Sequence, residues 1–182
     1  MKGIIFNLLE MAVSSEHGED TWDALLDAAG LEGAYTSLGS YPDADLLKLV
    51  EAAASALKKP TDAILRWLGQ RSVPVLADSY PQFFVPHSST RSFLLTLNEV
   101  IHPEVRKLYP GADVPVFDFD TSSHDAVVLG YQSHRKLCQF GEGLIEGGAA
   151  HFGEAVAIEQ PLCMNRGDAK CVLRVTFSRR AS

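Results

Sequence analysis

The 182-residue chain lacks the features that mark several large classes of protein. It has no apolar run of the roughly 20 residues that a membrane-spanning helix needs. Its 16 Lys and Arg residues against 23 Asp and Glu residues give a net charge of −7, which argues against binding to nucleic acid or to a membrane surface. It also has no glycine-rich phosphate loop, no nucleophile elbow and no informative carboxylate pair on a helix face. We therefore expect no enzyme activity.

Cysteine is also scarce, at three residues. An odd count in a chain that gives no other sign of secretion is typical of reduced thiols in the cytoplasm. The first residues contain Glu10 where a signal peptide would stay apolar, which indicates a helix of the mature fold. Since internal repeats, low-complexity tracts and linkers are all missing, we expect one cytoplasmic domain over residues 1–182.

Helical spacing dominates residues 1 to about 110. Apolar residues recur at intervals of three and four in four successive segments. The first predicted helix ends at Gly18, Asp20 caps the second, and Pro42 and Pro60 open the third and fourth. Pro74 should kink or end the fourth helix, because proline has no N–H to donate.

A strongly apolar helix is predicted over residues 91–101, with His102 and Pro103 directly after it. A residue before proline is pushed away from α geometry, so we expect a break or kink at His102. Taken alone, a histidine on an apolar face fits either a satisfied core residue or a metal ligand.

Strand-like segments follow residue 110. Residues 116–120 and 126–133 predict strands, and residues 155–160 and 171–177 predict a hairpin. Residues 135–152 predict a helix with four glycines, each of which costs about 0.5–1 kcal/mol relative to alanine. Such glycines are tolerated where something flat or bulky must approach the backbone. The fold class is therefore α+β: an N-terminal helical part followed by a small antiparallel sheet with a helix.

Three hydrogen-bond donors alternate after the apolar run 126–130: Tyr131, Ser133 and Arg135. In an extended chain they share one side, and Arg135 is permanently cationic. They suit a pair of carboxylates or a phosphate, although the spacing alone also fits a solvated strand end.

Together these residues resemble the H-NOX family, the haem-binding nitric oxide and oxygen sensor domains related to the haem domain of soluble guanylate cyclase. The resemblance covers essentially the whole chain, including residues 17–22 and 99–102. It is tightest at Tyr131-x-Ser133-x-Arg135, which a histidine precedes by about 30 residues and a glycine-rich helix follows. It implies the H-NOX fold, with haem buried between the helical part and the sheet.

The resemblance also assigns roles. It implies that His102 binds the iron of haem b and that Tyr131, Ser133 and Arg135 hold the propionates. Pro115 would pack against the porphyrin, and the glycine-rich helix would allow the porphyrin to approach closely.

Gas selectivity is expected to depend on the distal side of the iron. In oxygen-binding relatives a distal tyrosine lies on the helix after the motif, where this chain has Phe140, which cannot donate a hydrogen bond. The other positions that resemble the distal pocket are Ile5, Leu9, Leu76 and Leu144. We expect a sensor of nitric oxide that also binds CO and excludes dioxygen, unless Ser72 brings a hydroxyl into the pocket. An oxygen-binding sensor and a haem-free interaction module are the alternatives.

Output is expected to pass to a separate protein, because the chain shows no effector module. The family's bacterial stand-alone members act on histidine kinases or on cyclic-di-GMP enzymes, the diguanylate cyclases and phosphodiesterases. The signal would begin with the release of His102 from the iron.

The cysteines resemble a second site. Some family members bind zinc through three Cys and one His, and Cys138, Cys163 and Cys171 match the thiols. Gln160 stands where that histidine would be, which leaves His151 or water as the fourth ligand. Three unliganded thiols are the alternative.

Overall fold

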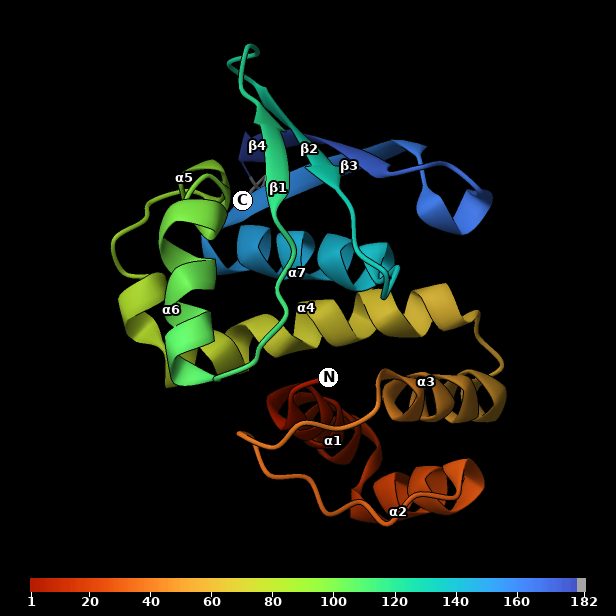
Figure 1. Cartoon of the computed structure of the whole chain (residues 1–182). Helices are drawn as coiled ribbons and strands as arrows, with labels where there is room; N and C mark the ends of the chain where they lie inside the picture. Colours follow the sequence, from red (N-terminus) through yellow and green to blue (C-terminus); the bar gives the residue numbers. More distant parts are fainter. Residues whose placement is uncertain (180–182) are drawn as a thin grey trace.

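The computed structural model describes residues 1–179, and its helices and sheet form stacked layers (Figure 1). Helices α1, α2 and α3 lie together on one side, α4 and α7 run side by side in the middle, and the sheet covers α7. The N-terminal helices are α1 (Gly3–His17), α2 (Glu19–Ala29), α3 (Asp43–Leu57) and α4 (Thr61–Ser79). A short 3-10 helix, η1 (Pro81–Phe83), follows them, and then come α5 (Thr90–Leu94), η2 (Leu97–Ile101) and α6 (His102–Leu108).

The N-terminal helices bury the apolar faces that their spacing predicts. Phe6, Leu9, Leu49, Ile64 and Leu68 are among the fully buried side chains of this core. The first helix ends at Gly18, whose φ of 89° is readily adopted by glycine. Asp20 does not cap the second helix as expected: Gly18 is the capping residue, and Asp20 lies in the first turn.

The sheet has the strand order β1-β2-β4-β3, and each neighbouring pair is antiparallel. Its strands are β1 (Phe117–Asp120), β2 (Ala126–Tyr131), β3 (Glu154–Leu162) and β4 (Cys171–Arg179), with α7 (Cys138–His151) between β2 and β3 and the 3-10 helix η3 (Met164–Arg166) between β3 and β4. Val127, Leu129 and Val175 form a buried layer with Ile145 of α7. The α+β fold expected from the sequence is confirmed.

Helices α4 and α7 pack through glycines, which we call the glycine seam (Gly69, Gly143 and Gly147). A Cβ on Gly143 would lie 2.0 Å from the carbonyl oxygen of Arg66, and one on Gly69 would lie 2.3 Å from that of Phe140. The backbones of the two helices therefore approach too closely for any side chain. Two of the four glycines that we expected to let a porphyrin approach, Gly143 and Gly147, instead hold two helices together.

Proline 74 does not end α4, which continues to Ser79. The proline has no N–H for the carbonyl of Gln70, one turn earlier. Gly147 of α7 lies against that carbonyl, since a Cβ there would be 2.9 Å from its oxygen. Packing against α7 along α4 thus supports a helix that local sequence disfavours.

The expected break near His102 falls before this residue rather than at it. Residues Leu97–Ile101 form a π-turn, in which the N–H of Ile101 bonds to the carbonyl of Thr96, and α6 begins at His102. Pro103 accounts for the widened turn, because its ring would crowd the carbonyl of Glu99 in a regular α-helix.

None of the helices in residues 1–179 has the length and apolar character needed to cross a membrane.

Candidate functional site

A cavity of about 470 Å³ lies where α1, α4, α6, α7 and the sheet meet. Most of the side chains around it are apolar, and they come from segments far apart in the sequence. This volume and lining are typical of a site for a sizeable, mostly apolar ligand.

His102, the first residue of α6, lies in the cavity lining. Its Nδ1 atom is buried and has no hydrogen-bond partner among the described residues. Burial lowers the pKa of His102 below its usual 6.5, and the nearby backbone carbonyl of Pro115 opposes this lowering only in part. The imidazole is therefore neutral at pH 7, the form that binds a metal.

The residues Tyr131, Ser133 and Arg135 all line the cavity, although strand β2 ends at Tyr131. The predicted strand was therefore two residues too long, and a loop and turn bring Ser133 and Arg135 to the cavity. The hydroxyl of Tyr131 accepts a hydrogen bond from the Leu137 N–H at 3.2 Å, which leaves its own proton free to donate.

Two carboxylates orient the guanidinium of Arg135. Its Nε donates to Asp43 at 2.9 Å, and its Nη1 donates to the carboxylate of Asp113 at 3.0 Å and to the backbone carbonyl of Asp113 at 2.7 Å. Among residues 1–179, none accepts a hydrogen bond from Nη2. Arg135 is thus oriented by the start of α3 and by the loop before β1, with donors to spare for a ligand in the cavity.

The apolar residues expected on the distal side mostly lie in the lining. Ile5, Leu76, Phe140 and Leu144 are there, and so is Pro115.

Leu9, however, is not in the lining: it is fully buried in the core of the N-terminal helices. On α1, Ile5 and Leu8 share the face toward the cavity, whereas Phe6 and Leu9 share the face toward the core.

Ser72 does not bring a hydroxyl into the cavity. It is fully buried, and its Oγ donates to the carbonyl oxygen of Leu68, one turn earlier in α4, at 2.7 Å. Among the glycines of α7, only Gly141 reaches the lining.

Sequence reasoning missed two tyrosines in the lining, Tyr80 and Tyr109. Their hydroxyls are hydrogen-bonded to each other. Tyr109 is seven residues after His102, a helical spacing that was the signal available for finding it, whereas no sequence signal points to Tyr80 as its partner.

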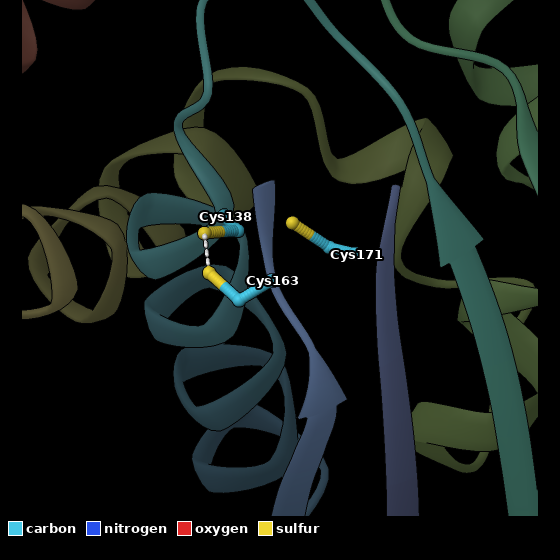
Figure 2. Close-up of side chains that lie close together, drawn as sticks. All are labelled: Cys138, Cys163 and Cys171. Atoms are coloured by element: carbon cyan, nitrogen blue, oxygen red, sulfur yellow. Dashed lines mark hydrogen bonds between the residues drawn. The ribbon is translucent and has the colours of Figure 1, made fainter. Parts of the chain in front are cut away.

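The three cysteines meet beside the start of α7, and all are buried (Figure 2). Their sulfur atoms lie within 4.8 Å of one another, and those of Cys138 and Cys163 are 3.7 Å apart. Burial raises the pKa of Cys138 to about 12, so without a metal this thiol stays protonated at neutral pH.

His151 is not a candidate for the fourth ligand. It ends α7 while Cys138 begins it, about 20 Å away at about 1.5 Å per residue. Its ring instead packs on Phe84 and Phe152, with ring centroids 5.1 and 4.9 Å away. Gln160 is nearer, since it contacts Gln139 of α7 and its Nε2 is buried without a partner among the described residues.

Comparison with known proteins identifies the fold. The model of the family described as Haem-NO-binding matches residues 2–160. The crystal structure of an H-NOX protein from S. oneidensis in the Fe(II)NO state is similar, with 31% sequence identity, a TM-score of 0.93, and coverage of 98% of this chain and 100% of that one. The unliganded Fe(II) H-NOX protein from K. algicida is similar at 27% identity and a TM-score of 0.89, over 100% of this chain and 99% of that one. No curated protein matches the chain.

The fold and the cavity thus define a haem-binding gas-sensor domain. The chain belongs to the Haem-NO-binding family, the H-NOX proteins.

The residues around the cavity fit a haem. They combine a neutral imidazole whose Nδ1 is unpartnered, apolar side chains for the porphyrin faces, and hydroxyl and guanidinium donors for two carboxylates.

Proposed function

We propose that this chain is a nitric oxide sensor that excludes dioxygen and signals through a separate protein. The observation that carries the proposal is the side chains of Ile5, Leu76, Phe140 and Leu144, which line the cavity and are all apolar. The solved S. oneidensis relatives include Fe(II)NO and Fe(II)CO states, which supports ligands of this kind.

In this proposal His102 binds the iron, and Tyr131, Ser133 and Arg135 hold the propionates, with Pro115 against the porphyrin. When bound, the haem b supplies a ferrous iron that takes up a diatomic gas. The carboxylates of Asp43 and Asp113 hold the guanidinium of Arg135 in one orientation. Its remaining donors are therefore already positioned when the propionates bind.

The exclusion of dioxygen follows from the lack of a hydrogen-bond donor among the distal residues. Dioxygen carries partial negative charge when bound and is held best by a hydrogen-bond donor, whereas nitric oxide and CO need none. Phe140 has no donor, and the hydroxyl of Ser72 is committed to the carbonyl of Leu68.

Exposure of the ferrous protein to air tests the selectivity. We expect its absorption spectrum to remain that of the ligand-free form and to change when nitric oxide is added. A new, reversible spectrum in air would refute the exclusion of dioxygen.

Output would begin at His102. Because His102 is the first residue of α6, its release frees the start of this helix, and the populations of two arrangements of the domain shift. We propose a histidine kinase or a cyclic-di-GMP enzyme as the partner. A His102→Gly variant, loaded with haem, should act on the partner alike with and without nitric oxide. A variant that still signals only in response to nitric oxide would contradict the release step.

We also propose the three thiols as a zinc site. A tetrahedron with Zn–S bonds of about 2.3 Å has edges of about 3.8 Å, and the sulfurs of Cys138 and Cys163 are 3.7 Å apart. Water would complete it, since His151 is too far away. Metal analysis of the purified protein decides between one zinc per chain and three free thiols.

A further inference from the structure

Tyr80 and Tyr109 join two helices that border the cavity. Tyr80 follows α4 directly, Tyr109 follows α6 directly, and the two hydroxyls form a hydrogen bond with each other. Both side chains line the cavity. The pair therefore connects the helix that carries Leu76 with the helix that carries His102.

Helix α6 has few other attachments. None of its seven residues, 102–108, is fully buried, and residues 106–108 are exposed. Before α6 the chain is fixed at Asn98, whose amide donates to the carbonyl of Phe117 at 2.7 Å and accepts from its N–H at 3.0 Å. Beyond α6, Lys2 donates to the carbonyl of Pro110 at 3.2 Å, exposed to solvent, and Arg135 holds Asp113 farther along the chain.

The tyrosine pair is the buried attachment at the far end of α6. Tyr109 is only 7% exposed, so its hydroxyl depends on a protein partner, and Tyr80 supplies it. Burial, together with the contact to Tyr80, raises the pKa of Tyr109. The Tyr109 hydroxyl therefore stays protonated over the whole physiological range of pH.

The tyrosine pair lies at the opposite end of α6 from His102. Tyr109, directly after α6, follows His102 by seven residues, about two helical turns, and both side chains lie in the cavity lining. Tyr80, directly after α4, follows Leu76 by four residues, and both of these side chains also lie in the lining.

We propose that the Tyr80–Tyr109 hydroxyl pair is a latch that positions α6 and thereby sets how readily His102 leaves the iron. This proposal rests on the proposed function, in which His102 is the iron ligand. Both tyrosines act through His102 and are positioning residues. With the latch closed, α6 is held at its far end and returns His102 to the iron. With the latch open, the helix loses this restraint and His102 is released more readily.

Single and double phenylalanine variants test the latch in the haem-loaded protein. Tyr80→Phe and Tyr109→Phe each remove the same hydrogen bond, so each should raise the ratio of released to bound His102 after nitric oxide addition by about 2- to 10-fold. Each should also lower the iron–histidine stretching frequency of the ferrous protein in resonance Raman spectra. The double variant should match the single variants, because only one bond exists to be lost.

Tyr35→Phe is the matched control. Tyr35 packs on Phe6 with ring centroids 4.2 Å apart, outside the cavity lining, and loses the same atom. It should leave the released fraction and the Raman frequency unchanged.

A readout without haem separates the latch from the proposed function. In the haem-free protein, the amides of residues 104–109 should exchange with solvent faster in both Tyr→Phe variants and at the parental rate in Tyr35→Phe. Tyr80→Phe keeps the test valid if Tyr109→Phe fails to fold, because Tyr80 is the less buried partner. If the parent binds haem but both Tyr→Phe variants keep its Raman frequency and released fraction of His102, the latch is refuted. The proposed function is unaffected by that result. A parent that binds no haem overturns the proposed function, and with it the role given to the latch.

Discussion

The glycine seam between α4 and α7 gives a prediction whose size follows from the structure. In Gly143→Ala, the new Cβ would lie 2.0 Å from the backbone oxygen of Arg66, and no rotamer change moves a backbone oxygen away. Overpacking of this kind costs about 1–3 kcal/mol. We place the cost at the upper end and subtract the 0.5–1 kcal/mol that alanine gains over glycine in a helix. The expected net loss is about 2 kcal/mol, or about 4–8 °C in Tm for a domain of this size.

Gly148→Ala is the control on the same helix. A Cβ there would meet only the Cγ2 atom of Thr90 at 3.8 Å, an ordinary van der Waals contact. This variant should gain about 0.5–1 kcal/mol. Thermal unfolding followed by circular dichroism, on both variants and the parent, measures the two shifts. A Gly143→Ala protein at least as stable as Gly148→Ala would refute the close approach of the two backbones.

Three other predictions address the proposed ligands. Phe140→Tyr places a donor beside the gas site and should allow reversible oxygen binding, seen as a changed absorption spectrum of the ferrous protein in air. Arg135→Gln removes charge-assisted hydrogen bonds worth about 1.5–3 kcal/mol, so the Kd for haem should rise about 10- to 150-fold in a haem-transfer assay; an unchanged Kd would exclude Arg135 from propionate binding. Cys163→Ser should reduce bound zinc well below the parental amount by metal analysis, and a parent without zinc would reject that site.

Most of the fold followed from local patterns in the sequence. The spacing of apolar residues located the N-terminal helices, and the strand-like residues 155–160 and 171–177 predicted the hairpin of β3 and β4. The misjudged points depended on contacts between distant segments. Pro74 is tolerated because α7 packs along α4, and the residues near Pro74 in the sequence do not predict that packing.

The sequence predicted the site residues that are identified by their chemical groups better than those that are identified by how the helices pack. His102 carries an imidazole and Arg135 a guanidinium, which are unusual among apolar residues unless they bind something, and both lie in the cavity lining. Leu8 and Leu9 are chemically identical, so only the rotation of α1 tells which one faces the cavity. Tyr80 lies 29 residues before its partner Tyr109, a pairing that only the folded structure brings about.

One absorption measurement tests most directly whether this chain is a haem-based nitric oxide sensor. The purified protein is supplemented with haem and reduced to the ferrous state, and its spectrum is recorded without oxygen before and after nitric oxide is added. We expect a Soret band that shifts when nitric oxide is added, to a position that indicates loss of the His102–iron bond. A colourless protein after haem supplementation, or a Soret band that nitric oxide leaves unchanged, would contradict this expectation.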